Sequence, residues 1–186
     1  ALLVQQTLTG RYQQAIATGC QALERLGVHI PDDRGAGLAT ELDRGRTLLG
    51  DRPIGSLLTL HTATSPEVSI AIRLLSRISP LSYIADPALC RLTTAMTVNL
   101  AFAHGHTPDS PFGYAFFGLL HSSALDSYQD AYEYGRLAMA LADRNDDASQ
   151  ICKTTHAFCA FINHWCRHLR EFDVINRRGF QAGVQS

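Results

Sequence analysis

The sequence predicts an all-α fold in which antiparallel helix hairpins pack into one domain. Apolar residues recur every three or four positions through most of the chain, which is the spacing of one face of a helix. No segment sustains the alternation of Val, Ile and Thr that marks a strand, and Asn-Gly and Asp-Gly turns do not occur. Pro and Gly residues divide the helical sequence into short pieces, which favours hairpins over one long helix.

The breaks set the expected helices in order. Gly27 ends one helix, and Pro53 follows the turn Gly50-Asp51-Arg52. Ser65-Pro66 and Asp86-Pro87 each place a capping residue before a proline at the first helical position. The segment "HGHTPDSP" at 104–111 is a loop, and "DRNDD" at 143–147 is a turn that supplies an N-cap. The expected helices span residues 1–8, 11–26, 36–49, 53–60, 66–79, 87–104, 110–124, 127–143, 147–166 and 169–183.

Composition indicates a soluble globular domain. The 186 residues are 46% hydrophobic and 18% charged, with a net charge of −1, which is enough for one sizeable core. The near-neutral, scattered charge argues against nucleic acid or a membrane surface as partner, and no stretch reaches the roughly 20 uninterrupted apolar residues of a membrane span. Five cysteines, an odd and sparse set, favour reduced thiols in the cytoplasm. Both ends lie in helical sequence, so we expect a segment of a longer protein.

A spaced pattern of aromatic and small residues occurs three times, each time after a short polar turn. It reads Tyr12-x2-Ala15-x3-Gly19-x2-Ala22, then Tyr128-x2-Ala131-x3-Gly135-x2-Ala138, then Phe172-x2-Ile175-x3-Gly179-x2-Ala182. These positions share one side of a helix. We expect the aromatic residue to fill the gap between paired helices and the glycine to admit a close neighbour, which offsets its cost of about 1 kcal/mol in a helix. Gly19 and Gly135 should therefore each contact a neighbouring helix.

The pattern resembles the second helix of the tetratricopeptide repeat (TPR). The matching residues are Gly10-Arg11-Tyr12-Gln13-Gln14-Ala15-Ile16 with Ala22-Leu23, and Asp126-Ser127-Tyr128-Gln129-Asp130-Ala131-Tyr132 with Ala138-Met139. Gly19 and Gly135 stand where the family usually has an aromatic residue, so the repeats are degenerate, and residues 28–105 are only TPR-like. The resemblance implies a TPR-like right-handed α-solenoid over residues 1–186. The clearest repeat units are about 1–27, 110–143 and 147–184.

A narrower resemblance covers nearly the whole chain. It rests on "ALERLGVHIPDD", "ELDRGRTLLGDRPIGSLLTL", "RLLSRISPLSYIADPAL", "SPFGYAFFGLLHSSALDSYQDAYEYGRLAMALADR" and "HAFCAFINHWCRHLRE", in this order. The chain resembles the helical region that follows the ATPase domain in large bacterial signalling proteins. These combine a Ser/Thr kinase, an AAA-type (STAND-like) ATPase and a sensor histidine kinase. The resemblance implies a regulatory cytoplasmic segment and transfers no catalytic residue.

Candidate chemistry is sparse. The Gly-rich piece "RGAGLAT" at 34–40 lacks the lysine of a phosphate-binding loop, and no kinase motif is present. Cys152, Cys159 and Cys166 lie seven residues apart, about 10.5 Å per step on a helix, too far to share a zinc ion or a disulfide. They fit a small buried stripe. We therefore expect no cofactor, no metal and no catalytic residue; an enzyme would need a convergent polar cluster in a deep pocket.

A binding role is the remaining prediction. TPR hairpins line a concave groove with their first helices. Counting back from Phe172 and Tyr128 gives a candidate groove of Phe116, Leu120, Ser123, Ala160, His164, Arg167 and His168, beside Gly113, with the Arg and His residues suited to an acidic ligand. Trp165 is expected in the packing core between repeats.

We thus expect a non-catalytic interaction and signal-relay segment of a bacterial signalling ATPase/kinase, which binds a protein or peptide partner or neighbouring domains of its own chain. The alternative is an effector-binding domain of a STAND-type transcriptional regulator. A homodimer through the apolar faces of the terminal helices stays open.

Overall fold

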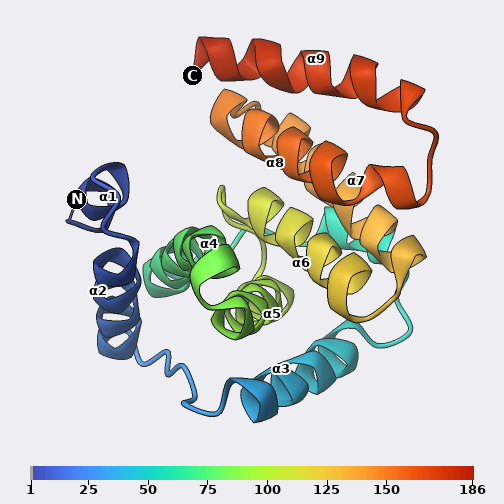
Figure 1. Cartoon of the computed structure of the whole chain (residues 1–186). Coiled ribbons are helices and arrows are strands. Elements are labelled where there is room, and N and C mark those ends of the chain that lie inside the picture. Colours follow the sequence, from blue (N-terminus) through green and yellow to red (C-terminus); the bar gives the residue numbers. More distant parts are fainter. Residues whose placement is uncertain (1) are drawn as a thin grey trace.

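The computed structural model describes residues 2–186 and is all-α over that range (Figure 1). It contains no strand there, only an isolated bridge between Thr62 and His106. The elements are α1 (Leu2–Leu8), α2 (Tyr12–Arg25), α3 (Arg34–Leu49), the 3-10 helix η1 (Ile54–Thr59), α4 (Pro66–Ala85), α5 (Pro87–His104), α6 (Ser110–Ala124), α7 (Tyr128–Asn145), α8 (Ala148–Phe161), the 3-10 turn η2 (Asn163–Trp165) and α9 (Arg170–Gln185). The predicted all-α class is confirmed for these residues.

Most helix ends lie at the predicted local signals. The Ser65 hydroxyl accepts a hydrogen bond from the amide of Val68 at 3.2 Å, and Asp86 accepts from Leu89 at 3.0 Å. Asp147 caps α8 in the same way by accepting from Gln150 at 3.0 Å. These bonds satisfy amides that a helix start leaves without a partner, so the short polar turns fix where the helices begin.

Helix α4 continues past its predicted end at residue 79. Pro80 lies inside the helix, which runs on to Ala85. A proline removes one backbone hydrogen bond and usually ends or kinks a helix. Here Ile78, Ser79 and Ser82 are buried on both sides of Pro80, and both serine hydroxyls donate to carbonyls of the same helix. Packing of this turn against neighbouring helices therefore outweighs the local signal.

Helix α8 ends five residues before its predicted end at 166. Ile162 leaves the helical conformation at φ −120° and ψ −55°, and a 3-10 turn follows. Ile162 and Asn163 are buried by this turn, whereas His164 and Trp165 are exposed. The helical spacing used to place residues beyond 161 was therefore wrong.

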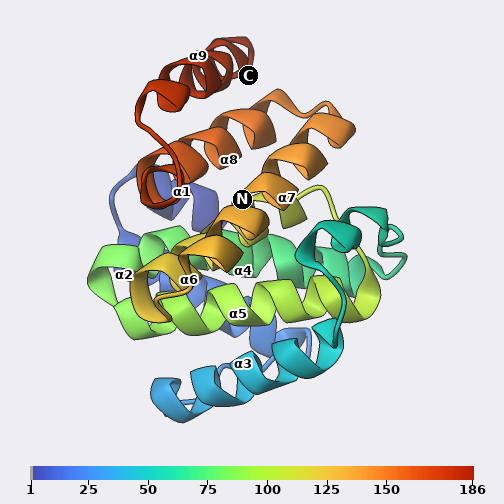
Figure 2. The same cartoon turned by 90° about the vertical axis from the view of Figure 1, so that its right-hand side faces the viewer.

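Consecutive helices pair in four hairpins: α1 with α2, α4 with α5, α6 with α7, and α8 with α9. Helix α3 does not pair with a neighbour in the chain. It packs on α5, while α2 packs on α4, so α4 and α5 lie between α2 and α3 (Figures 1 and 2). Asn99 of α5 holds this contact by donating to the backbone and side chain of Glu41 at 2.7 and 2.6 Å.

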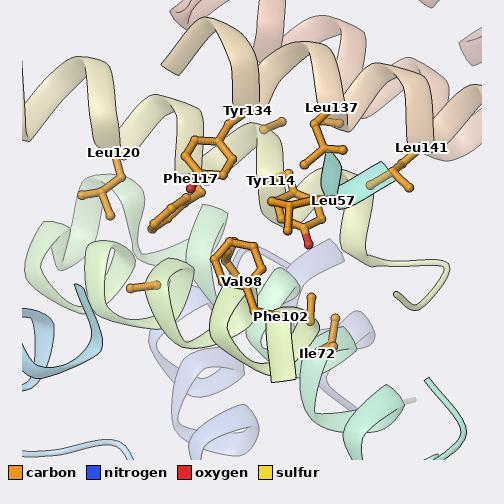
Figure 3. Packing of buried hydrophobic residues seen from close by; sticks show 14 of the residues in the cluster. Leu57, Ile72, Val98, Phe102, Tyr114, Phe117, Leu120, Tyr134, Leu137 and Leu141 are labelled. Carbon is orange, nitrogen blue, oxygen red and sulfur yellow. The ribbon is translucent and has the colours of Figure 1, made fainter. Parts of the chain in front are cut away.

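The main core lies where α5, α6 and α7 meet η1 (Figure 3). Leu57 of η1 and Tyr114 of α6 are fully buried there, and Tyr134 of α7 stacks on Tyr114 with ring centroids 6.4 Å apart. His106 is also buried, hydrogen-bonded through Nε2 to the Leu57 carbonyl at 2.8 Å. Within residues 2–186, α4 alone has the length and hydropathy of a membrane span; it packs between helices of the core.

All three pattern glycines contact another helix closely, as expected for Gly19 and Gly135. A Cβ on Gly19 would lie 2.8 Å from Ile78 of α4, and one on Gly179 would lie 2.7 Å from Thr155 of α8. A Cβ on Gly135 would overlap the ring of Phe158, also on α8. Gly19 of α2 thus contacts α4, Gly135 of α7 contacts the following helix α8, and Gly179 of α9 contacts the preceding helix α8. The three positions share close packing but have no equivalent partner, unlike positions in a strict repeat.

Candidate binding groove

A groove of about 740 Å³ lies between the N-terminal helices and segments of α4, α6 and α8. We call it the α1/α8 groove. Figure 1 shows α1 and α8 on either side of it, with α4 below. The residues that line it come from α1, the start of α2, the C-terminal half of α4, the start of α6 and the first half of α8: Leu3, Val4, Thr7, Leu8, Tyr12, Ser76, Arg77, Pro80, Leu81, Ile84, Ala85, Asp109, Phe112, Gln150 and Lys153.

One part of the groove is apolar and open to solvent. Leu8 at the end of α1 is 83% exposed, and Ile84 near the end of α4 is 88% exposed. Val4, Tyr12 and Leu81 extend the same wall. Single exposed apolar residues are common, but several that line one cavity mark a surface suited to binding.

Another part is polar and is built by the starts of α6 and α8. Asp109, which precedes α6, accepts a hydrogen bond from Arg73 of α4 at 3.0 Å and one from the amide nitrogen of Gln150 at 3.5 Å. Lys153 lies one turn after Gln150, and its Nζ is 5.6 Å from the ring centroid of Phe112. Charged groups and an apolar ring thus meet at this end.

Gln150 is the buried member of the polar end. Its residue is 3% exposed, and its Oε1 atom has no hydrogen-bond partner. Because Asp109 can only accept, the orientation of the amide is fixed with nitrogen toward the carboxylate. An unpaired buried carbonyl of this kind costs about 1–3 kcal/mol, so it marks a position where a bound donor would gain stability.

Three of the predicted groove residues line a different and smaller cavity. Phe116, Leu120 and Ser123 of α6 line a cavity of about 320 Å³ against the junction of α4 and α5. Phe116 and Leu120 are buried in it, next to Cys90, whose thiol pKa is raised by burial to about 11. Gly113 lies deeper, where its α carbon faces Thr97 of α5.

The other four predicted residues lie outside both cavities. Ala160 is half-buried near the end of α8, and His164, Arg167 and His168 are exposed on the turn that leads to α9. Arg167 stacks on Tyr132 at 4.9 Å and donates to its hydroxyl at 3.2 Å. The early end of α8 places His164, Arg167 and His168 beyond the helix, and the seven predicted residues do not line one cavity.

The aromatic residues of the pattern are also placed differently from the prediction. Trp165 is 54% exposed and stacks on Tyr128 with centroids 5.0 Å apart, so it covers the start of α7 at the surface instead of lying in the core. Tyr12 is 51% exposed and lines the α1/α8 groove. Only Phe172 packs against a buried cluster, on α8.

A second cavity of about 580 Å³ is lined by residues of α3, the start of η1, α6 and α7. His121 and Asp130 face it, with Nδ1 of the histidine 3.9 Å from the carboxylate. Burial lowers the pKa of His121, and the nearby carboxylate opposes that shift. At neutral pH this side chain is therefore uncharged.

The cysteines form no site. All five are free, and residues 2–186 contain no group of three His, Cys, Asp or Glu side chains placed to hold a metal ion. Cys159 is buried, and burial raises its thiol pKa to about 11. Cys152 and Cys166 are half-buried, and the Cys166 thiol donates to the Tyr128 carbonyl at 3.2 Å.

Sequence reasoning missed the α1/α8 groove because its walls come from four distant segments. One signal was present: Lys153, the only lysine of the chain, lies one helical turn after Gln150, on the side of α8 where the polar end of the groove forms. Comparisons with family models, with curated proteins and with solved structures find no match for the chain.

Proposed function

We propose that this chain is a non-catalytic interaction and relay segment of a cytoplasmic bacterial signal-transduction protein. In this proposal the segment couples an AAA-type ATPase to downstream kinase output through a TPR-like right-handed α-solenoid. The resemblance of its helical segments to such proteins supports the assignment. The four helix hairpins and the close glycine contacts are compatible with it, although the docking of α3 on α5 departs from a regular repeat.

The observation that carries the proposal is the set of exposed apolar residues on the two terminal helices. Leu8 lies on α1, and Phe180 and Val184 lie one turn apart on α9. The inner face of α9 is already used, because Gly179 and Ala182 pack on α8. The outer residues are therefore available to neighbouring domains or to a partner protein, and such patches mark interaction surfaces.

The proposal is tested by photo-crosslinking in the full-length protein in its native cells. A photoreactive phenylalanine replaces Ile84 at the groove or Phe180 on α9, and a control protein carries it at Thr40, which is exposed on the opposite helix α3. We expect defined crosslinked peptides from a neighbouring domain or one partner at Ile84 and Phe180 but not at Thr40. Equal, unspecific labelling at all three sites would count against an interaction role.

The second candidate is an effector-binding domain of a STAND-type transcriptional regulator. The groove favours it, because about 740 Å³ lies within the size of ligand pockets, roughly 300–1,000 Å³, and Gln150 offers an unused carbonyl. The domain that follows in the full-length chain decides between the two: a DNA-binding domain supports the regulator, and a histidine kinase supports the relay.

A further inference from the structure

Polarity changes along one face of α4, where it forms the floor of the α1/α8 groove. Arg73 and Arg77 lie one turn apart, followed by Pro80, Leu81 and Ile84 on the same side. Residues three and four apart on a helix are neighbours. The groove therefore runs from a basic end near the starts of α6 and α8 to an apolar end between α1 and the end of α4.

The basic end carries uncompensated positive charge. Arg73 pairs with Asp109 at 3.0 Å, so these two charges balance. Arg77 and Lys153 have no carboxylate within ion-pair distance among residues 2–186. Both side chains are exposed and line the groove. An anionic group at this end would contact two cations at no cost to an existing ion pair.

Two buried polar atoms at the same end also lack partners. They are Oε1 of Gln150 and the hydroxyl of Ser76, on α8 and α4. Both residues line the groove and are more than nine-tenths buried. An anionic head group accepts from the serine hydroxyl, and a bridging water can donate to the glutamine carbonyl.

We propose that the α1/α8 groove binds a monomeric anionic amphiphile, a single hydrocarbon chain that ends in a carboxylate. The carboxylate lies between Arg77 and Lys153, and the chain lies along Leu81 and Ile84 under Leu8 of α1. This ligand buries the apolar residues that are now exposed and neutralises the two free cations together. The inference names the ligand of the groove and goes beyond the proposed interaction role.

The test measures binding of three probes to the 186-residue chain by calorimetry, below the micelle concentrations of the two ionic probes and below the solubility limit of dodecanol. Dodecanoate carries the charge and the chain, dodecanol lacks the charge, and dodecyltrimethylammonium reverses it. We expect one dodecanoate per chain, with dodecanol bound roughly 25-fold more weakly, because the contacts with both cations are lost at about fivefold each, and the cationic probe more weakly still, because both contacts are reversed.

Variants locate the site. Arg77→Gln and Lys153→Gln should each weaken dodecanoate binding about fivefold without changing dodecanol binding, as expected for exposed ion pairs. Arg136→Gln, an exposed arginine on α7 away from the groove, serves as the matched control and should bind dodecanoate like the unchanged protein. Ala85→Trp fills the apolar end from an exposed position and should weaken both probes.

Several results would overturn the inference. These are no dodecanoate binding, equal binding of the charged and uncharged probes, or loss of affinity in the Arg136 control equal to that in the groove variants. The proposed function fails separately. If dodecanoate does not bind but Ile84 crosslinks to a defined protein, the amphiphile is excluded and the interaction role stands.

Discussion

Gly135 is the position where adding one methyl group should be most informative. It lies in the middle of α7, and a Cβ there would overlap the ring of Phe158 and lie 3.4 Å from Ile162. Phe158 is 1% exposed, so its ring has little room to move. Overpacking of this kind costs about 1–3 kcal/mol, while alanine gains about 1 kcal/mol over glycine in a helix.

The Gly135→Ala variant should therefore be less stable by about 1–2 kcal/mol, at the upper part of the overpacking range less the helix gain. The assay is urea unfolding followed by circular dichroism. In a chain of this size each kcal/mol corresponds to roughly 2–4 °C in Tm, so thermal unfolding should agree with a fall of about 2–8 °C.

The matched control is Gly35→Ala on α3. A Cβ at Gly35 would meet only Asp33 Oδ1, at an ordinary contact distance of 3.4 Å. This exposed helical glycine should gain about 0.5–1 kcal/mol on becoming alanine. A Gly135→Ala protein as stable as the Gly35→Ala protein would refute the argument that close packing of α7 on α8 selects the glycine.

Three further outcomes follow from buried groups. Burial lowers the pKa of His106 below the usual 6.5. The contribution of His106 to the free energy of unfolding is therefore complete above pH 6.5 and is lost as the pH falls toward the folded pKa, with a slope of at most about 1.4 kcal/mol per pH unit. This part of the pH dependence should be missing from the urea midpoints of the His106→Gln variant. Burial raises the pKa of the Cys90 and Cys159 thiols to about 11. An aromatic disulfide reagent at pH 8 should therefore modify these two thiols only after the protein unfolds. Modification of the folded protein as fast as that of a free thiol would contradict their buried placement. Leu57→Ala should cost about 2–5 kcal/mol in urea unfolding because the side chain is fully buried at the centre of the main core, and a loss below 1 kcal/mol would place η1 outside it.

Helix positions were predictable because their signals are local. Ser65, Asp86 and Asp147 each cap a helix through a bond to an amide three residues ahead, and Gly27 ends α2 with φ +74°. A capping side chain, its proline and the first turn lie within four residues of one another. The sequence alone is therefore sufficient to predict where these helices begin.

Tertiary contacts decided the points where the prediction was wrong. Pro80 is tolerated because the turn around it is buried, and α8 stops at Phe161 because the following turn buries Ile162 and Asn163. The docking of α3 on α5 includes a hydrogen bond from the Asn99 amide to Glu41 across 58 positions of sequence. None of these contacts has a spacing pattern, so periodicity could not reveal them.

In the candidate site, too, regular helices were predictable, whereas positions set by tertiary contacts were not. Counting along α6 places Phe116 and Leu120 on a regular helix, where both line the small cavity, but counting along α8 failed for His164, which lies beyond the end of that helix. The α1/α8 groove depends on where α1 folds back relative to α4. That position is set by the contact of Leu3 with Gly19 and by the turn at Gly10 with φ +72°.

The same geometry bears on the proposed relay role. Helix α1 has seven residues, too few to be stable alone, so its position depends on its packing on α2 and on Leu3. Leu8 at its end gains a partner only when the groove is filled. A ligand held at the other side by Lys153 of α8 would thus add contacts between α1 and α8, which are far apart in the sequence. Because a ligand shifts a conformational equilibrium by its difference in affinity between the two states, occupancy would favour the state in which α1 is docked, and whatever binds α1 or α9 would respond to it.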